Sequence, residues 1–516
     1  SDMGSSLLVS LLVLPLVSSD SFSVLRLTPS DSLGKEAIEA LYSNASVLGL
    51  DFWKTGHDGG GFWDVMVGRE RKGMVEELMS AVNVSYKVTI EDVEQLIKDR
   101  EHKRHKPFSP WLRDDSVSRA GYDFRRYSSY ATMQKWMRAL VRDFPDLCQM
   151  TSIGLSHEGR SIDGLEIGFN KETSRVFWID GGIHAREWAA PHTALYFIHQ
   201  LTSRSEEQAV RRLLQEITFV IMPCVNPDGY EFTRSSTNPH IRLWRKNRSP
   251  MICNVDVFER RRCCRGVDLN RNFDFHFRES GSSDDPCSEI YQGKAAFDQP
   301  EARSIRDAVL SRRYKDRMDG FITLHTYSQI WIHSFGHKKD AYPGDVDDLK
   351  QVALKATAAL KQMYGTQYVV GSGADTLYPA SGGSEDWVKA STNVKYVYLI
   401  ELRPEEQNWD GFILDERELL PTARETWEGV KVVAEAILDR KHEMDERLAR
   451  LFTSNNKSLR SLQRARVNSA PKAGRAPCFN VKMSCERWLR ERPGLCSQLT
   501  TFMQENCALS CGFCRT

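Results

Sequence analysis

The stretch that decides the fold is Gly181-Gly182-Ile183-His184-Ala185-Arg186-Glu187-Trp188, which lies between an apolar run at 176–179 and a segment with helical apolar spacing at 191–201. This order is typical of a β-strand that leads through a turn into a helix. Histidine and glutamate three residues apart on such a turn can face one side, and an imidazole plus a carboxylate are two of the three protein ligands of a catalytic zinc ion. The pair alone is equally consistent with an ordinary helix start.

Two later apolar runs end in side chains that suit the same site, His325 after the first and Glu401 after the second. The carboxyl ends of parallel strands meet at one edge of a sheet, where open α/β proteins bind their ligands. We therefore expect His184, Glu187 and His325 to bind a metal ion, with Glu401 beside it as an unligated carboxylate.

Further motifs follow in order between about Tyr122 and about Leu438. They are His184-Ala185-Arg186-Glu187, Leu243 to Asn247, Gly266 to Asn272, His325 to Gln329, Tyr378 to Ser384 and Glu401-Leu402-Arg403. In this order they resemble the zinc metallocarboxypeptidases of the pancreatic carboxypeptidase A/B type. The resemblance implies an α/β fold at 122–440, with a mixed, largely parallel sheet and helices on both faces, and alternating strand-like and helical runs agree with it.

The resemblance also implies a role for each matched residue. One Zn²⁺ per chain would be bound by His184, Glu187 and His325, and Asp268 would accept the second ring N–H of the first histidine. Glu401 would act as general base and Arg245 would stabilise the negative charge of the intermediate. The matched substrate-binding residues are Arg186, Asn270 and Arg271 as a carboxylate clamp, Tyr378 as a mobile cap, and Tyr327 and Phe412 as lining residues. Core packing is the alternative for Phe412, and the substrates would be the C-termini of peptides or proteins.

Two residues of the predicted side-chain pocket favour substrates that end in lysine or arginine. Gly373 stands where A-type enzymes place a bulky aliphatic residue, and Glu385 stands where B-type enzymes carry an aspartate. A buried carboxylate would favour a cationic partner over an apolar one. One alternative stays open: Glu385 simply belongs to the acidic first turn of a helix, and the enzyme then prefers apolar or aromatic ends.

The residues before the predicted enzyme domain form a domain of their own. Residues 20–104 show the order β-α-β-β-α-β of a ferredoxin-like sandwich, and the resemblance implies an activation domain of that shape. Residues 105–121 are polar, and with Arg104, Arg113 and Arg119 they offer basic sites where an activating protease would cut. A plain solvated linker is the alternative.

Composition and leader indicate a secreted protein of several domains. The chain has 516 residues, 41% hydrophobic and 27% charged, with a net charge of +1, which gives no bulk field for nucleic acid or an anionic membrane. Residues 1–19 read as a signal peptide, and no other stretch approaches transmembrane length. Twelve cysteines and four N-x-Ser sequons, at Asn44, Asn83, Asn247 and Asn456, agree with secretion.

Past the enzyme domain, residues 441–477 are predicted to form a basic flexible linker and residues 478–514 a disulfide-held domain, because six cysteines lie in a segment too short for a core of its own. Its spacing resembles the ShK-toxin-like domain. That resemblance implies the pairs Cys478–Cys514, Cys485–Cys507 and Cys496–Cys511, and the enzyme family implies Cys264–Cys287. Cys253 and Cys263 are candidates for a local pair, and Cys148 and Cys224 for buried thiols.

We therefore predict a secreted zymogen of a zinc carboxypeptidase. A catalytically silent binding protein that acts through the C-terminal module, whose target the sequence does not indicate, is the rival; such a protein usually loses a zinc ligand or the glutamate base, and this chain keeps all of them.

Overall fold

The structure is a computed structural model. It describes residues 21–56, 61–102, 117–118, 121–255, 261–467, 478, 480–481, 485–491, 493–498 and 500–514. The predicted signal peptide and most of the predicted activation linker lie outside these residues. The chain divides into two compact units, Ser1–Lys441 and His442–Thr516.

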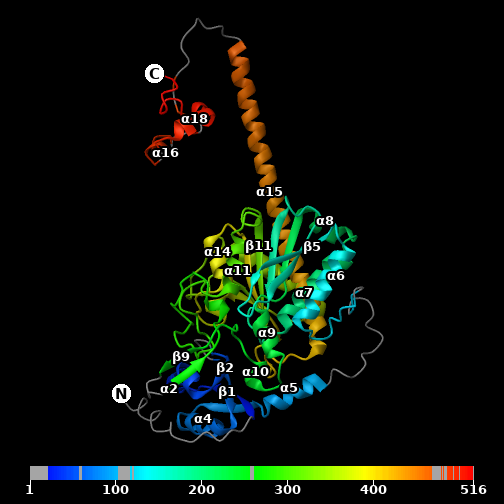
Figure 1. The fold of residues 1–516 in the computed structure, drawn as a ribbon, viewed down its shortest axis with the longest axis vertical. Helices are drawn as coiled ribbons and strands as arrows, with labels where there is room; N and C mark the ends of the chain where they lie inside the picture. Colours follow the sequence, from blue (N-terminus) through cyan, green and yellow to red (C-terminus); the bar gives the residue numbers. More distant parts are fainter. Residues whose placement is uncertain are drawn as a thin grey trace. The chain divides into compact units, whose positions relative to one another are not determined.

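The first domain has the predicted β-α-β-β-α-β order (Figure 1, blue). Its elements are β1 (Phe22–Thr28), α2 (Ser32–Ser43), α3 (Ala45–Leu48), β2 (Asp51–Lys54), β3 (Trp63–Gly68), α4 (Arg69–Ala81), β4 (Ser85–Ile90) and α5 (Val93–His102). The strands form an antiparallel sheet in the order β2-β3-β1-β4. Because strand side chains alternate between faces, Leu25 and Leu27 pack on the helices, whereas Val24 packs toward Tyr327 and Phe412 of the next domain.

The second domain alternates strands and helices. Its elements are α6 (Tyr130–Asp143), β5 (Cys148–Leu155), β6 (Ser161–Ile167), β7 (Arg175–Gly181), α7 (Ala189–Ser203), α8 (Gln208–Glu216), β8 (Ile217–Met222), α9 (Pro227–Thr233), α10 (Pro239–Arg242), β9 (Ile252–Val255), β10 (Arg261–Cys264), η2 (Leu269–Arg271), α11 (Pro300–Val309), β11 (Met318–Ser328), β12 (Ile330–His333), α12 (Val346–Tyr364), β13 (Val369–Ser372), α13 (Gly373–Thr376), α14 (Ser384–Ser391), β14 (Tyr396–Glu405), η3 (Glu416–Glu418) and α15 (Leu419–Val467).

One eight-stranded sheet organises this domain, in the order β13-β12-β14-β11-β7-β8-β6-β5. The central strands β14, β11, β7 and β8 are parallel, and the pairs β12–β14, β6–β8 and β5–β6 are antiparallel. The predicted fold class, a mixed and largely parallel sheet, is confirmed. The sequence did not indicate the edge strand β5 or the four-residue strands β12 and β13, which have too few residues to show a period.

Helices cover both faces of the sheet (Figure 1). Phe177 and Ile179 of β7 point into a core shared with α6, α7, α12 and α15, whereas Val176 and Trp178 point into a second core shared with α11 and α14. Both faces are apolar because a parallel sheet is buried on both sides. The two cores fix the positions of the strand ends, where the candidate site lies.

The last helix of this domain differs from the prediction. Residues 441–467, expected to belong to a flexible linker, continue α15, which runs to Val467. The chain has neither proline nor glycine between 430 and 470, so nothing interrupts a helix rich in Ala, Leu, Lys and Arg. Residues 468–477 lie outside the described part.

The C-terminal unit contains α16 (Cys485–Glu491), α17 (Leu495–Gln498) and α18 (Thr500–Asn506) around the buried side chain of Met503. The structure pairs the cysteines as the resemblance implies, Cys478–Cys514, Cys485–Cys507 and Cys496–Cys511, and in the enzyme domain Cys264–Cys287 and Cys253–Cys263. Cys148 and Cys224 are buried free thiols, as expected.

Two further predictions concern the surface. Within the described residues, none of the helices has the length and apolar character needed to cross a membrane. Asn44 and Asn83 are exposed, but Asn247 is buried and its amide donates hydrogen bonds to Gln299 and Glu301. The Asn247 sequon therefore has no room for a glycan.

Candidate active site

The candidate site lies at the carboxyl ends of three neighbouring strands, β7, β11 and β14. β11 pairs in parallel with both others, so that Leu324 is level with Gly181 and His325 is level with Glu401. His184 follows Gly181 by three residues on the turn into α7. The sheet register therefore brings both histidines and Glu401 to one edge.

The turn after β7 places His184 and Glu187 on the same side. Gly182 has φ +66°, and a Cβ there would lie 2.9 Å from the ring of Pro191, so only glycine fits the tight start of the turn. The backbone N–H of Glu187 then donates to the carbonyl of His184 at 3.3 Å. This short turn brings the side chains of His184 and Glu187 next to His325 of β11.

His184, Glu187 and His325 form the one group of three potential metal ligands found in the described part of the chain, with ligand atoms within 4.8 Å of one another. His184 Nδ1 lies 2.7 Å from Glu187 Oε1, and His325 Nδ1 lies 3.1 Å from His184 Nδ1 and 3.2 Å from Glu187 Oε2. All three residues are buried.

The donor atoms of this cluster suit a bound cation. His184 Nε2 lies 3.1 Å from Asp268 Oδ1, which makes Nε2 the donor and leaves a lone pair on Nδ1 facing Glu187. Burial alone would raise the pKa of Glu187, but the two histidines hold it well below its ordinary value, so the carboxylate is charged. Two imidazole nitrogens and a carboxylate are a known zinc donor set, and these residues would hold Zn²⁺.

Asp268 connects the metal ligands to the rest of the site. Besides His184, its carboxylate accepts hydrogen bonds from Arg245 Nε and from the backbone N–H of Asn270, both at 3.0 Å. Burial would raise the pKa of Asp268, but Arg245 and His184 lower it far below the usual range. One buried carboxylate thus fixes both the first histidine and the arginine beside it.

Glu401 lines the same cavity at the end of β14. Its Oε2 is buried and has no hydrogen-bond partner within the described ranges. Burial raises the pKa of the Glu401 carboxyl to about 8; the neighbouring His325 lowers it and Glu187 raises it. A carboxylate with an unoccupied oxygen next to the metal ligands is placed to accept a proton.

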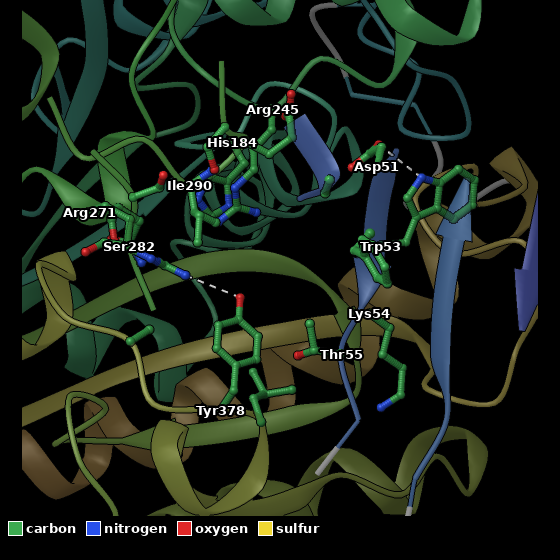
Figure 2. A pocket seen from close by; sticks show the side chains of 18 of the residues that line it. Asp51, Trp53, Lys54, Thr55, His184, Arg245, Arg271, Ser282, Ile290 and Tyr378 are labelled. Carbon is green, nitrogen blue, oxygen red and sulfur yellow. Dashed lines mark hydrogen bonds between the residues drawn. The ribbon is translucent and has the colours of Figure 1, made fainter. Parts of the chain in front are cut away.

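The predicted carboxylate clamp lines the same cavity as Glu401. Arg271 Nε donates to the carbonyl of Gly281 at 2.7 Å and Nη1 to that of Asn270 at 2.9 Å, while Nη2 points to the hydroxyl of Tyr378 at 3.3 Å (Figure 2). Asn270 Oδ1 accepts the backbone N–H of Ser384 at 2.9 Å. Two backbone carbonyls therefore fix the Arg271 guanidinium, and its remaining nitrogen contacts Tyr378, the predicted cap.

Glu385 lies in the wall of the cavity, 8% exposed. Its Oε2 accepts a long hydrogen bond from Asn270 Nδ2 at 3.4 Å. Gly373 and Gly336 line the same cavity. They pack closely, because a Cβ added to Gly373 would lie 3.5 Å from the Gly336 Cα, and neither adds a side chain to the wall.

The first domain covers this site. The cavity, of about 590 Å³, is lined by residues of both domains. Arg186 Nη1 donates to both carboxylate oxygens of Asp51 on β2, at 2.8 and 3.1 Å (Asp51 is labelled in Figure 2). Arg186 also stacks on Phe412, 4.0 Å from the ring centroid, and Trp53 packs edge-on against the same ring at 5.7 Å. A substrate cannot use Arg186 while Asp51 occupies it.

Further contacts hold the first domain on the segment 405–415 of the enzyme domain. Arg26 Nη1 donates to the carbonyl of Gln407 at 2.9 Å, and Arg100 Nη2 pairs with Asp410 Oδ2 at 3.0 Å. Other ion pairs of this contact are Lys54–Glu406 and Arg100–Asp415. The segment that carries Phe412 is thus fixed by cations of the first domain.

The sequence missed three contributors to the site. Asp51 begins a strand of another domain, and no motif pointed to it. Glu289 lines the cavity two residues after Cys287, and its only signal was that closeness to a disulfide. Gly336 lines the cavity close to Gly373 without any local pattern in the sequence. The predicted catalytic, metal-binding and substrate-binding residues all line the cavity. Asp268 does not line it but contacts two residues that do, His184 and Arg245.

Comparison with known proteins identifies the family. The family model of zinc carboxypeptidases matches residues 133–429, that of the carboxypeptidase activation peptide matches 25–100, and that of ShK-like domains matches 477–514. The chain belongs to the zinc carboxypeptidase family. It is a peptide hydrolase with an activation peptide and a C-terminal ShK-like domain.

Individual relatives agree with this assignment. Carboxypeptidase B of Astacus astacus is 41% identical over 61% of this chain and 99% of its own length, and carboxypeptidase A1 of Bos taurus is 34% identical over 81% and 94%. The crystal structure of thrombin activatable fibrinolysis inhibitor is similar with a TM-score of 0.69 and 28% identity, over 81% of this chain and 99% of that one.

Proposed function

We propose that the chain is a secreted zymogen that, after proteolytic removal of residues before the enzyme domain, cleaves single amino acids from the C-termini of peptides, with a preference for lysine and arginine. One observation carries this proposal: a zinc donor set, an unpaired glutamate and a guanidinium clamp share one cleft, and the activation domain closes it. The predicted leader, the disulfides and the activation domain support secretion.

The geometry of the cleft supports the following catalytic roles. Zinc, when bound, supplies a Lewis acid and an open coordination position. Glu401 accepts a proton from the water that attacks the scissile carbonyl carbon and returns it to the nitrogen of the leaving amine. Arg245, fixed by Asp268 at 3.0 Å, stabilises the negative charge that develops on the carbonyl oxygen.

Substrate binding depends on the free C-terminus. Arg271 would exchange Tyr378 for the terminal carboxylate of the peptide, which a guanidinium binds with two parallel hydrogen bonds. Arg186, once Asp51 has left, is available to residues that precede the last one. An internal peptide segment has no free carboxylate and would leave Arg271 unpaired, so the enzyme cleaves at the C-terminus of the substrate.

The preference for basic ends comes from Glu385. Glu385 lines the same cavity as Gly373 and Gly336, and the long contact from Asn270 leaves its carboxylate able to accept an ammonium or guanidinium. An apolar side chain would leave this buried charge unpaired, which is unfavourable. Gly373, which also lines the cavity, adds no side chain of its own to the wall.

The test is kcat/KM of the activated enzyme on matched peptides that end in Arg, Lys, Phe or Leu. We expect the basic ends to be cleaved at least about tenfold better, and Glu385→Ile to shift the ratio toward Leu, since pairing at a desolvated charge is worth a few kcal/mol. Glu279→Gln, an exposed acid whose side chain is 60% accessible, is the control and should leave the ratio unchanged. A higher value for Phe or Leu in the unmodified enzyme would overturn the preference.

A further inference from the structure

One acid of the cleft has no part in the chemistry described above. The enzyme domain contributes five acidic residues to the cavity: Glu187, Asp285, Glu289, Glu385 and Glu401. Glu187 belongs to the metal centre, Glu401 accepts the proton, and Glu385 lines the terminal pocket. Asp285 is engaged with Arg262 and with Ser46 of the activation domain. Glu289 remains unassigned.

Glu289 presents an unused acceptor to the cleft. Its Oε2 is buried and lacks a hydrogen-bond partner among the described residues. The side chain comes from the loop anchored by the Cys264–Cys287 disulfide, and its chain neighbour Ile290 also lines the cavity (labelled in Figure 2). A buried carboxylate oxygen without a donor is costly, so such a group is expected to meet its donor in another state of the protein.

The cations near Glu289 are committed elsewhere. Lys246 Nζ donates to the carbonyls of Pro286 and Ser288 at 2.8 and 2.9 Å, which holds the loop in place. Arg245 is neutralised by Asp268. Their charges act on Glu289, but no hydrogen bond from either reaches its Oε2 within the described residues.

Removal of the activation domain changes the surroundings of Glu289. After burial, the charge of Asp51 is the largest influence on the pKa of Glu289, which it raises. Arg186, the cation that Asp51 pairs with, also acts on Glu289 and lines the same cavity, so with Asp51 gone Glu289 remains as an acid near the arginine proposed to bind the residues before the last one. Arg186 can contact the main-chain carbonyls of the peptide, which leaves Glu289 to face a side chain.

We propose that Glu289 is a specificity-determining residue that accepts a hydrogen bond and an ion pair from a lysine or arginine located one or two positions before the C-terminal residue of the substrate. This rests on the proposed carboxypeptidase function. The enzyme would then prefer peptides with consecutive basic residues at the end, because Glu385 receives the last side chain and Glu289 an earlier one.

The test uses the protease-activated enzyme and peptides that share a C-terminal arginine and carry Lys, Gln or Glu at the second or third position from the end. We expect kcat/KM for Lys to exceed that for Glu by about tenfold at one of these positions, and Glu289→Gln to reduce this ratio to within about twofold of unity. Glu279→Gln, matched in chemistry at an exposed residue that does not line the cavity, should keep the ratio.

Two results would overturn the proposal: an unchanged ratio in Glu289→Gln, or an equal loss on all three peptides, which would indicate a purely structural role. Binding of the same peptides to activated Glu401→Gln enzyme, with and without Glu289→Gln, is measured by calorimetry in parallel. If no variant releases amino acids the carboxypeptidase function fails, yet the ratio of binding constants still decides whether Glu289 discriminates.

Discussion

Replacement of Asp51 by asparagine tests how the activation domain keeps the enzyme inactive. The carboxylate forms an ion pair with Arg186 through two contacts at 2.8 and 3.1 Å, and the side chains are 15% and 3% exposed. It also accepts the indole N–H of Trp53 at 3.2 Å. The substitution keeps the size of the side chain and removes its charge.

The magnitude follows from the burial of this pair. Breaking a buried ion pair typically costs about 3–5 kcal/mol, but asparagine retains one hydrogen bond to Arg186, and the loss of repulsion between Asp51 and Glu289 offsets part of the cost. A net loss of about 2 kcal/mol in the closed state remains, which raises the open fraction about 30-fold. We expect the uncut protein with Asp51→Asn to show about 10 to 100 times the basal activity of the unmodified zymogen.

The assay is hydrolysis of a small C-terminal arginine substrate before and after protease treatment. Glu91→Gln is the control, since Glu91 lies in the activation domain with a side chain 78% exposed and forms an ion pair with Lys72 at 3.1 Å. After complete activation all three proteins should have the same kcat/KM. Equal basal activities of Asp51→Asn and the unmodified zymogen, with unchanged circular dichroism, would refute the role of this ion pair.

Three further predictions concern the enzyme and its C-terminal module. Glu401→Gln should retain zinc, measured by metal analysis, but lose about 10² to 10⁴-fold in kcat because the amide is a poor proton acceptor; activity within a few-fold of the unmodified enzyme would place the base elsewhere. Asp268→Asn should weaken zinc binding about 10 to 100-fold in a chelator competition assay, since His184 loses its charged partner; an unchanged affinity would contradict this. Truncation after Arg450 should leave peptidase activity intact, because every catalytic position lies before Gly429; a folded but inactive truncated protein would refute it.

The sequence predicted the site residues that belong to short local motifs. His184, His325 and Glu401 each follow an apolar run, and a parallel sheet brings the ends of such runs together whatever the detailed strand order. The edge strands β12 and β13 were not predicted because four residues are too few to show an alternation. The helical extension to Val467 was not predicted because the polar composition of residues 441–467 is typical of a linker. The absence of proline and glycine from this segment is the signal that favours a helix.

Contacts between domains could not be predicted at all from one sequence. The ion pair of Asp51 with Arg186 depends on how two separately folded surfaces meet, and neither residue carries a local signal for the other. The isolation of Glu289 Oε2 is likewise a property of the packed cleft. Glu385 shows the intermediate case, since its position in the chain was recognised but only the structure shows that it lines the cavity and contacts Asn270.

The most direct test of the central claim is the release of free amino acids from a peptide that ends in arginine by the full-length protein, measured before and after treatment with trypsin. The uncut protein should be nearly inactive. The treated protein should release the terminal arginine alone, lose this activity with a zinc chelator and regain it on addition of zinc. Release that is complete without cleavage, or that persists in chelator, would contradict a zinc carboxypeptidase held inactive by its activation domain.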